Sequence, residues 1–376
     1  MSKIPSAIVI GAGFTGCAVA YDLALRGFDV TVVERGDIAN GTSGRTHGLL
    51  HSGGRYCVND QEAAIECIEE NVILRKIASQ CIEFNGGLFV GLNQSDLDYV
   101  DRWIKGAEIS RIPIKEIPPK VVLSTEPRLS SEIKVAYEVP DGVFDPLRLA
   151  LSFAASAKAH GALFFTFHEV IALLVTSGCV KGVRVTDRTS GNDRDLYADI
   201  TINATGAWAG QIARMANAHI EITPTPGVMV AFDQRLSQKV INRMNEPGDG
   251  DIIIPQRKMM VTGTTSFEVD NLDYIPVEED QVKLMIDRSN ELIPSITATK
   301  LRGVYMSARP LIGSSVEGRS LTRTFKCYDH TESDGVDGVI TITGGKATTC
   351  RAMAEKTVNL VCKKMDVKRS CTTKDH

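Results

Sequence analysis

Residues 7–34 read AIVIGAGFTGCAVAYDLALRGFDVTVVE. A short apolar run leads into a G-x-G-x-x-G turn, a helical pattern follows as far as Gly27, and a second apolar run ends at Glu34. This order of strand, glycine turn, helix, strand and acidic residue is the context in which the glycine pattern indicates a dinucleotide site. The stretch therefore predicts a βαβ unit at the start of an α/β fold.

Each glycine of the turn has its own expected task. Gly11 allows the tight turn, Gly13 lets the backbone approach a pyrophosphate at the helix N-terminus, and Gly16 lets helix and strand pack closely. Glu34 is expected to accept hydrogen bonds from ribose hydroxyls. A plain strand–helix turn is the competing interpretation, and the acidic residue after the second strand makes it the weaker one.

A second dense motif follows within ten residues. Residues 42–56 read TSGRTHGLLHSGGRY, a run of glycine, hydroxyl and cationic residues. A nicotinamide-binding domain has no need of such a stretch, whereas a flavin is a long prosthetic group that must be held along its whole length. The two motifs together favour a flavin cofactor.

Composition narrows the class of protein further. The chain has 376 residues, 43% of them hydrophobic, and a net charge of −4, which does not favour a nucleic-acid partner. Its nine cysteines form no C-x-x-C pair, so the sequence indicates no disulfide framework, zinc site or iron–sulfur site. Free thiols, a start without a signal peptide and the lack of a long apolar run predict a cytoplasmic protein.

The rest of the chain alternates helices, strands and insertions. The pattern predicts helices over 61–80, 96–109, 145–160 and 348–364, and strands over 87–92, 162–166, 170–175, 182–187, 196–203, 228–232, 251–255, 259–264 and 339–343. We expect a discontinuous nucleotide domain with a second domain formed by two insertions. The predicted pieces are 1–86, 141–215 and 303–366 for the nucleotide domain, 87–140 and 216–302 for the second, and 367–376 for a polar tail that frays.

These motifs resemble the FAD-dependent glycerol-3-phosphate dehydrogenases of the glycine/D-amino-acid oxidase superfamily, and most of all the catalytic subunit of the anaerobic bacterial branch. The resemblance runs nearly end to end and is carried by GAGFTG, RTHGLLHSGGRY, VPDGVFDPLRL, HEV, NATGAWA, GTTS, SARPL and TITGGKATT. It implies a Rossmann-like FAD-binding domain of the glutathione-reductase-like, D-amino-acid oxidase type. It also implies an antiparallel-sheet substrate or cap domain over the flavin.

The resemblance implies a reaction as well. It is the oxidation of sn-glycerol 3-phosphate to dihydroxyacetone phosphate, with hydride passing to non-covalently bound FAD. Electrons would then leave to a quinone, directly or through an electron-transfer partner subunit, at a peripheral membrane contact on the cytoplasmic face. The anaerobic relatives continue into a cysteine-rich C-terminal domain and the aerobic ones into a helical region, so we expect a partner to supply the electron exit.

The residues that the resemblance assigns to the cofactor are gathered from all parts of the chain. They are Gly11, Gly13, Phe14, Thr15, Gly16, Glu34, Arg35, Thr42, Ser43, Arg45, His47, Gly48, Leu49, Val170, Ala204, Thr205, Gly206, Trp208, Gly345, Lys346, Ala347 and Thr348. The turn before the last helix is not a P-loop, since Ile340 and Ala347 stand where that motif needs glycine and a hydroxyl residue. We expect this helix N-terminus to stabilise negative charge on reduced flavin.

An anionic substrate needs cationic partners. Arg55, Arg309 and Arg323 stand in or beside glycine- or proline-containing turns, and arginine suits bidentate phosphate binding. We assign substrate binding to these three arginines with Tyr56 and Thr265, and catalysis to Arg55, Arg309, His51 and Lys346. His51 or Lys346 is the expected proton acceptor, although a histidine in a glycine-rich loop is more often structural.

Three alternatives stay open at this point. A glycerol-3-phosphate oxidase would share the site and pass electrons to oxygen. Another FAD-dependent enzyme of the superfamily could oxidise an amino acid or a 2-hydroxy acid, because a carboxylate also suits Arg309. The chain could also be a flavin-binding subunit without turnover.

Overall fold

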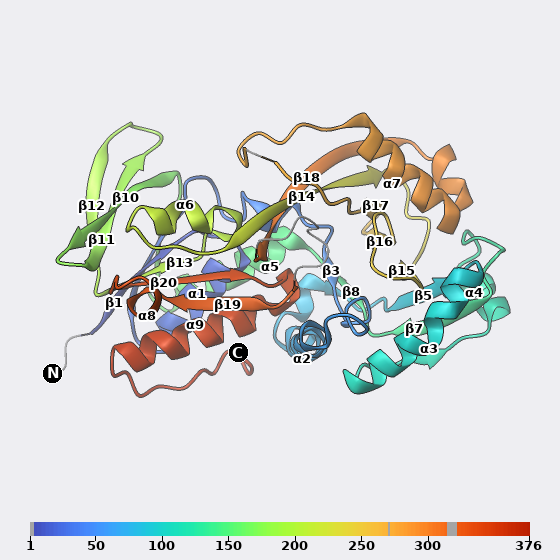
Figure 1. The fold of residues 1–376 in the computed structure, drawn as a ribbon, viewed down its shortest axis with the longest axis horizontal. Coiled ribbons are helices and arrows are strands. Elements are labelled where there is room, and N and C mark those ends of the chain that lie inside the picture. The colour runs from blue at the N-terminus through green and yellow to red at the C-terminus, as the bar shows by residue number, and fades with distance from the viewer. Residues whose placement is uncertain (1–3, 270, 314–321) are drawn as a thin grey trace.

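The computed structural model describes residues 4–269, 271–313 and 322–376, and its elements form two large sheets side by side (Figure 1). One sheet has six strands and begins with the predicted βαβ unit. Its order is β19 (Phe325–Asp329), β20 (Val339–Gly344), β13 (Ile200–Asn203), β1 (Ser6–Ile10), β2 (Asp29–Val33) and β9 (Leu163–Phe165). All neighbours are parallel except β19, which is antiparallel to β20.

Three helices pack on one side of this sheet. They are α1 (Phe14–Leu25), α5 (Pro146–Ala159) and α9 (Cys350–Lys364), and their apolar side chains join those of β1 and β2 in the largest buried cluster. The cap of α5 is the predicted one, because the Asp145 carboxylate accepts a hydrogen bond from the Arg148 amide at 3.0 Å and proline occupies the first turn.

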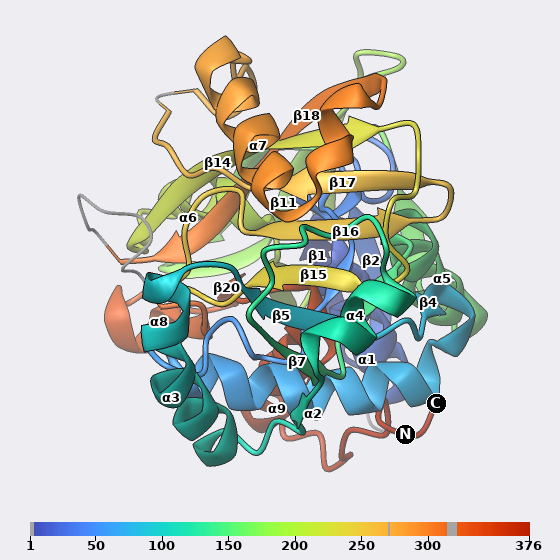
Figure 2. The same cartoon turned by 90° about the vertical axis from the view of Figure 1, so that its right-hand side faces the viewer.

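The second large sheet has eight strands, which cross the view in Figure 2. Their order is β18 (Leu301–Ile312), β14 (Ile222–Phe232), β17 (Met259–Gly263), β16 (Ile252–Gln256), β15 (Val240–Arg243), β5 (Gly87–Gly91), β7 (Val135–Val139) and β6 (Lys115–Glu116). Helices α7 (Glu279–Leu292) and α4 (Pro119–Thr125) cover one face through buried Met285, Leu292 and Val122. The sheet is mixed rather than purely antiparallel, because β15 runs parallel to β5.

Smaller elements complete the fold. Two smaller sheets have three strands each: β10 (His168–Thr176), β11 (Cys179–Asp187) and β12 (Asp193–Tyr197) in one, and β3 (Leu49–Leu50), β8 (Gly142–Phe144) and β4 (Ile82–Glu83) in the other. The other α-helices in the described residues are α2 (Gln61–Ile77), α3 (Gln94–Ile109), α6 (Ala209–Arg214) and α8 (His330–Ser333). No helix in the described part of the chain combines the length and the apolar character needed to cross a membrane.

The α/β class and the Rossmann-like core are confirmed, and two details of the strand prediction were wrong. The run 196–203 is two strands in different sheets, because the Asp199 carboxylate accepts from the Ser6 amide at 2.9 Å and makes a break between them. Strand β18 had not been predicted. It pairs with β14 along its length, although residues from 303 onward had been grouped with the nucleotide domain.

The C-terminal tail is also ordered, contrary to the expected fraying. The Thr373 side chain is buried and its hydroxyl lies 3.2 Å from a guanidinium nitrogen of Arg351. The carbonyl of Arg369 accepts a hydrogen bond from the buried Arg26 guanidinium. The polar composition of the tail had suggested solvent exposure, but the Thr373 hydroxyl and the Arg369 carbonyl contact the buried guanidinium groups of Arg351 and Arg26.

Candidate cofactor and substrate site

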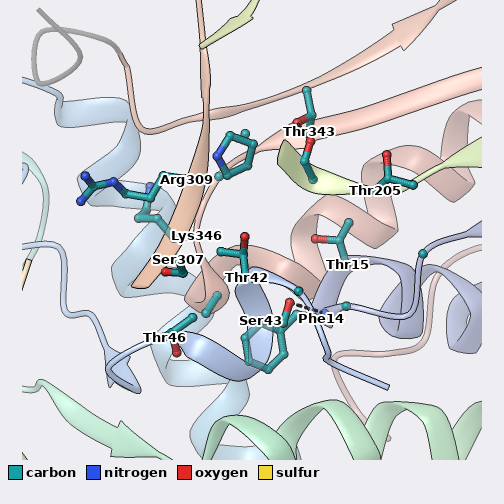
Figure 3. Close-up of a pocket in the computed structure, with 18 of the residues that line it drawn as sticks. Phe14, Thr15, Thr42, Ser43, Thr46, Thr205, Ser307, Arg309, Thr343 and Lys346 are labelled. Atoms are coloured by element: carbon teal, nitrogen blue, oxygen red, sulfur yellow. Dashed lines mark hydrogen bonds between the residues drawn. The ribbon is translucent and has the colours of Figure 1, made fainter. Parts of the chain in front are cut away.

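A single long cavity of about 1220 Å³ runs between the two sheets, and both glycine-rich motifs line it (Figure 3). The ends of β1, β2, β13 and β20 supply one wall, while β18 and the loop after β17 supply another. A cavity of this size exceeds the usual range for a drug-sized ligand, so it suits an extended dinucleotide with a second small molecule beside it.

The glycine turn has the geometry that the sequence predicts. Gly11 has a φ of +99°, and a Cβ on Gly16 would lie 1.9 Å from the Gly11 carbonyl oxygen. A Cβ on Gly13 would lie 2.8 Å from the Ser43 hydroxyl, which accepts a hydrogen bond from the Phe14 amide at 2.9 Å. The second motif therefore caps the first helix, and the two motifs form one cradle.

Glu34 organises this cradle from the end of β2. One carboxylate oxygen accepts from the Ala12 amide at 2.9 Å, and the other accepts from the Gly36 amide at 2.8 Å. Each oxygen keeps a further lone pair, and the side chain lines the cavity, so it can still accept from ribose hydroxyls.

Arg35, Trp208 and Asp273 contact one another at the wall of the cavity that also contains Glu34. The Arg35 guanidinium stacks on the Trp208 ring at 4.6 Å, and both side chains donate to Asp273, at 2.7 Å and 3.0 Å. Asp273 belongs to the loop between β17 and α7, so the eight-stranded sheet is tied to the nucleotide side at this point.

The other end of the cavity is cationic. Arg309 is held by the Thr264 hydroxyl at 2.6 Å and by the Thr265 carbonyl at 2.8 Å, and its Nε has no partner among the described residues. Arg55 donates to the Gly248 carbonyl at 2.8 Å. Burial and the neighbouring positive charges of Arg323 and Arg55 lower the pKa of Arg309 to about 9, so this end of the cavity favours an anion.

Lys346 adds a fourth positive charge. It begins the turn after β20, its ammonium donates to the Arg323 carbonyl at 2.6 Å, and it lies 5.0 Å from the centre of the Tyr56 ring. Figure 3 shows Lys346 and Arg309 on the same side of the cavity. The lysine sits immediately after Gly345, whose φ of +66° permits the turn that carries it.

Two histidines lie between the cradle and the cations. Burial and the charges of Arg309 and Arg55 lower the pKa of His47 to about 4. Burial, with help from His47 and Lys346, also lowers the pKa of His51 well below its ordinary range. The His47 Nδ1 accepts from the Leu49 amide at 3.1 Å, which leaves its proton on Nε2. Both rings are therefore neutral at pH 7, and a neutral ring can accept a proton.

The predicted site residues line this cavity with four exceptions, which are Gly16, Gly48, Thr265 and Thr348. Gly16 and Gly48 act through close backbone packing, since added Cβ atoms would meet the carbonyls of Gly11 and Phe144. The Thr348 hydroxyl accepts from the His51 amide at 3.1 Å and so holds the histidine loop. The predicted substrate contact of the Thr265 hydroxyl was wrong, because that buried group accepts from the Val228 amide at 2.9 Å.

Two cavity residues beside Arg309 were not predicted from the sequence. Ser307 and Thr264 both line the cavity, and Thr264 contacts the arginine directly. Ser307 precedes Arg309 by two residues on β18, so the alternation of a strand could have placed both side chains on one face. Thr264 had no such signal, because it follows the end of β17.

Comparison with known proteins agrees with this arrangement. The family model described as FAD dependent oxidoreductase matches residues 6–358. The chain belongs to this family. FAD is thus the cofactor expected in the long cavity, and the fold assigned from the sequence is that of the family.

Individual relatives narrow the comparison. One subunit of the anaerobic glycerol-3-phosphate dehydrogenase from Escherichia coli K12 is 41% identical over 378 residues, covering 100% of this chain and 70% of the relative. The corresponding protein from Haloferax volcanii is 43% identical and covers 100% of this chain. This chain spans 66% of the Haloferax volcanii protein. The solved glycerol-3-phosphate dehydrogenase of Bacillus halodurans complexed with FAD superposes with a TM-score of 0.78 at 25% identity, covering 99% of this chain and 67% of that one.

The residues of this FAD-dependent oxidoreductase fit the cofactor of its family. Gly13 and Phe14 at the N-terminus of α1 line the cavity, and a helix N-terminus suits a pyrophosphate. The carboxylate of Glu34 stands at the end of β2, where the acidic residue of a dinucleotide site belongs. Positive φ angles at Gly344 and Gly345 aim a further turn at the cavity.

Proposed function

We propose that the chain oxidises sn-glycerol 3-phosphate at its C2 hydroxyl to dihydroxyacetone phosphate. The observation that carries the proposal is the cationic end of the cavity, formed by Arg55, Arg309, Arg323 and Lys346. No carboxylate among the described residues pairs with Arg309, and its Nε lacks a partner. A phosphate dianion would supply both the charge and the acceptor oxygens. The names of the relatives support the same substrate.

The chain's own side chains account for binding and orientation. Arg309 is fixed by Thr264 and by the Thr265 carbonyl, so a phosphate held there has one preferred position. Holding the substrate by its anionic end places the carbinol carbon toward the histidine loop, which is catalysis by orientation. Bound FAD would supply the hydride-accepting chemistry next to that carbon.

His51 is the proposed proton acceptor. Its side chain is buried, with 8% exposed, and its backbone amide is held by the Thr348 hydroxyl. Burial and nearby cations keep the ring neutral, so its lone pair is free to take the proton of the substrate hydroxyl. Lys346 already donates to the Arg323 carbonyl, which suits it to charge stabilisation instead.

We also propose the onward path of the electrons. A quinone or an electron-transfer partner subunit, met at the cytoplasmic face of the membrane, would reoxidise the flavin. Support comes from the relatives, whose names describe them as subunits of anaerobic dehydrogenases. A soluble short-chain quinone tests direct transfer, while peroxide formed in air would instead favour an oxidase.

Anaerobic reduction of the purified flavoprotein tests the substrate. We expect sn-glycerol 3-phosphate to bleach the flavin and glycerol to bleach it poorly, because glycerol brings no anion to the cationic end. Glycine and a 2-hydroxy acid serve as carboxylate controls for the amino-acid and hydroxy-acid alternatives. Rapid bleaching by a carboxylate, with none by glycerol 3-phosphate, would overturn the proposal.

A further inference from the structure

A buried chain of hydrogen bonds leads away from the cavity at Thr205. The Thr205 hydroxyl lies 2.7 Å from Asn203 Oδ1, and Asn203 Nδ2 lies 3.2 Å from the Thr341 hydroxyl. That hydroxyl lies 2.8 Å from His330 Nε2, and His330 Nδ1 lies 2.7 Å from the Asp334 carboxylate. The chain thus joins a cavity residue at the end of β13 to a carboxylate at the end of α8, across β20.

The inner end fixes the orientation of the asparagine. Asn203 Nδ2 also lies 2.9 Å from the carbonyl oxygen of Ala209, and a carbonyl can only accept. The nitrogen must therefore face Ala209 and Thr341, and the amide oxygen must face Thr205. Because that oxygen can only accept, the hydrogen of the Thr205 hydroxyl is committed to Asn203.

The outer end of the chain accommodates the direction that Asn203 sets. Burial alone would raise the pKa of Asp334, but hydrogen bonds from Ser333 and His330 hold it below its ordinary value, so the carboxylate is ionised. When Nδ1 of His330 donates to that carboxylate, Nε2 of the ring is the acceptor for the Thr341 hydroxyl. Every hydrogen in the chain points from the cavity toward Asp334.

We propose that Thr205 is a specificity-determining residue of the cofactor cavity that can only accept hydrogen bonds. Its hydrogen is committed to Asn203, so its lone pairs are what it offers to the cavity that it lines (Figure 3). The ligand class that suits this position is a hydroxyl or amino donor of the dinucleotide. A phosphate oxygen, which is itself an acceptor, is disfavoured there. Asn203, Thr341, His330 and Asp334 are positioning residues that maintain this polarity.

The test compares three variants of the full-length protein. Thr205→Val removes the acceptor and Thr205→Ser restores it. Thr201→Val is the matched control, because Thr201 lies on β13, the strand just before Thr205, and its buried hydroxyl has no partner in the described residues. The readouts are the rate of FAD release from the holoprotein, followed by flavin fluorescence, and the inhibition of FAD rebinding by AMP, riboflavin and inorganic pyrophosphate.

We expect Thr205→Val to release FAD about five- to tenfold faster, the effect of one neutral hydrogen bond, while Thr205→Ser and Thr201→Val stay near the wild type. Inhibition by AMP or by riboflavin should weaken by a similar factor, and inhibition by pyrophosphate should not change. Weaker inhibition by pyrophosphate would show that Thr205 donates to phosphate and would overturn the proposal. Unchanged FAD release in Thr205→Val would also overturn it.

A second pair of variants tests the positioning residues. Thr341→Val removes the link between Asn203 and His330, while Thr341→Ser keeps a hydroxyl. We expect Thr341→Val to speed FAD release in the wild type and to have no further effect in Thr205→Val, because both act through the same hydroxyl. Additive effects would show that Thr341 is only structural. None of these readouts uses a substrate, so they are independent of the proposed oxidation of glycerol 3-phosphate.

Discussion

At the scale of single residues, the site depends on the Arg309 guanidinium, which has no carboxylate partner among the described residues. Arg309 is partly buried and held by neutral oxygens, and the partly buried His47 and the buried His51 line the same cavity. A cation that is partly removed from water and has no counter-ion is unfavourable, and an anionic ligand would supply the missing charge. A substitution that removes the positive charge of Arg309 and keeps the fold therefore tests the proposed function.

Arg309→Ala should weaken the binding of glycerol 3-phosphate by about 2 kcal/mol or more, because the phosphate loses a charged hydrogen-bonding partner. The measurement is the substrate concentration that half-reduces the flavin under anaerobic conditions. Thr265→Ser is the matched control, because it keeps the hydroxyl that accepts from Val228 and the carbonyl that holds Arg309. Unchanged affinity in Arg309→Ala would mean that the anion is bound elsewhere.

The neutral histidines predict a pH dependence of stability. The pKa of His47 is about 4 in the folded protein and ordinarily 6.5, so the unfolded chain takes up its proton first. The free energy of unfolding should therefore fall as the pH is lowered from about 6.5 to about 4. Urea denaturation across this range measures the slope, and His47→Gln should reduce it. If the free energy of unfolding of His47→Gln depended on pH as steeply as that of the wild type, the lowered pKa of His47 would not be the cause.

At the scale of elements, the cradle depends on close contact between β1 and α1. The G-x-G-x-x-G turn brings Gly16 against the Gly11 carbonyl, and the Ser43 hydroxyl then caps the helix. The N-cap residue itself is Gly13, which has no side chain to do this. A helix whose cap comes from a separate motif orders both motifs together, so disturbing either should release the cofactor.

Gly16→Ala should cause the flavin to be lost or very weakly held. The new Cβ would lie 1.9 Å from the Gly11 carbonyl oxygen, so α1 would have to move away from β1. Gly210→Ala in α6 is the control, because the nearest atom to its Cβ is the end of the Arg214 side chain at 3.4 Å. The measurement is the flavin-to-protein ratio after purification. A full complement of FAD in Gly16→Ala would contradict the packing role.

At the scale of the whole molecule, the C-terminal tail and α9 are tied to α2 by a buried ion pair. The Arg351 guanidinium binds the Glu70 carboxylate through two hydrogen bonds, and it also contacts Glu355 and Thr373. Both Arg351 and Glu70 are almost fully buried. This pair joins residues 281 positions apart, so it connects the beginning and the end of the chain.

Glu70→Ala should lower the free energy of unfolding by about 3 kcal/mol, because it leaves a buried guanidinium short of its partner. Lys76→Ala is the control, since the ion pair of Lys76 with Asp375 is exposed and should matter little. Urea denaturation of both variants measures the difference. Equal midpoints for the two variants would show that the buried pair adds no stability.

Local patterns were enough to predict the nucleotide half of the molecule. The βαβ unit, the cap of α5 and the turn at Gly345 follow from residues close together in the sequence, and these elements form as expected. The same reasoning failed at β18, because residues 301–312 mix glycine, serine, arginine and proline and have no clear alternation. That strand is stabilised by its pairing with β14, which is distant in the sequence.

The sequence by itself determined the family, the cofactor and the cationic residue types of the site. Only the tertiary structure decided how these residues are used. The partner of each polar group depends on segments that meet in space. Thus Ser43 caps α1, the Thr265 hydroxyl accepts from the Val228 amide, and the Thr205 hydroxyl donates to Asn203. Hydrogen bonds and buried charges act over a few ångströms, so their roles are fixed by packing between remote segments.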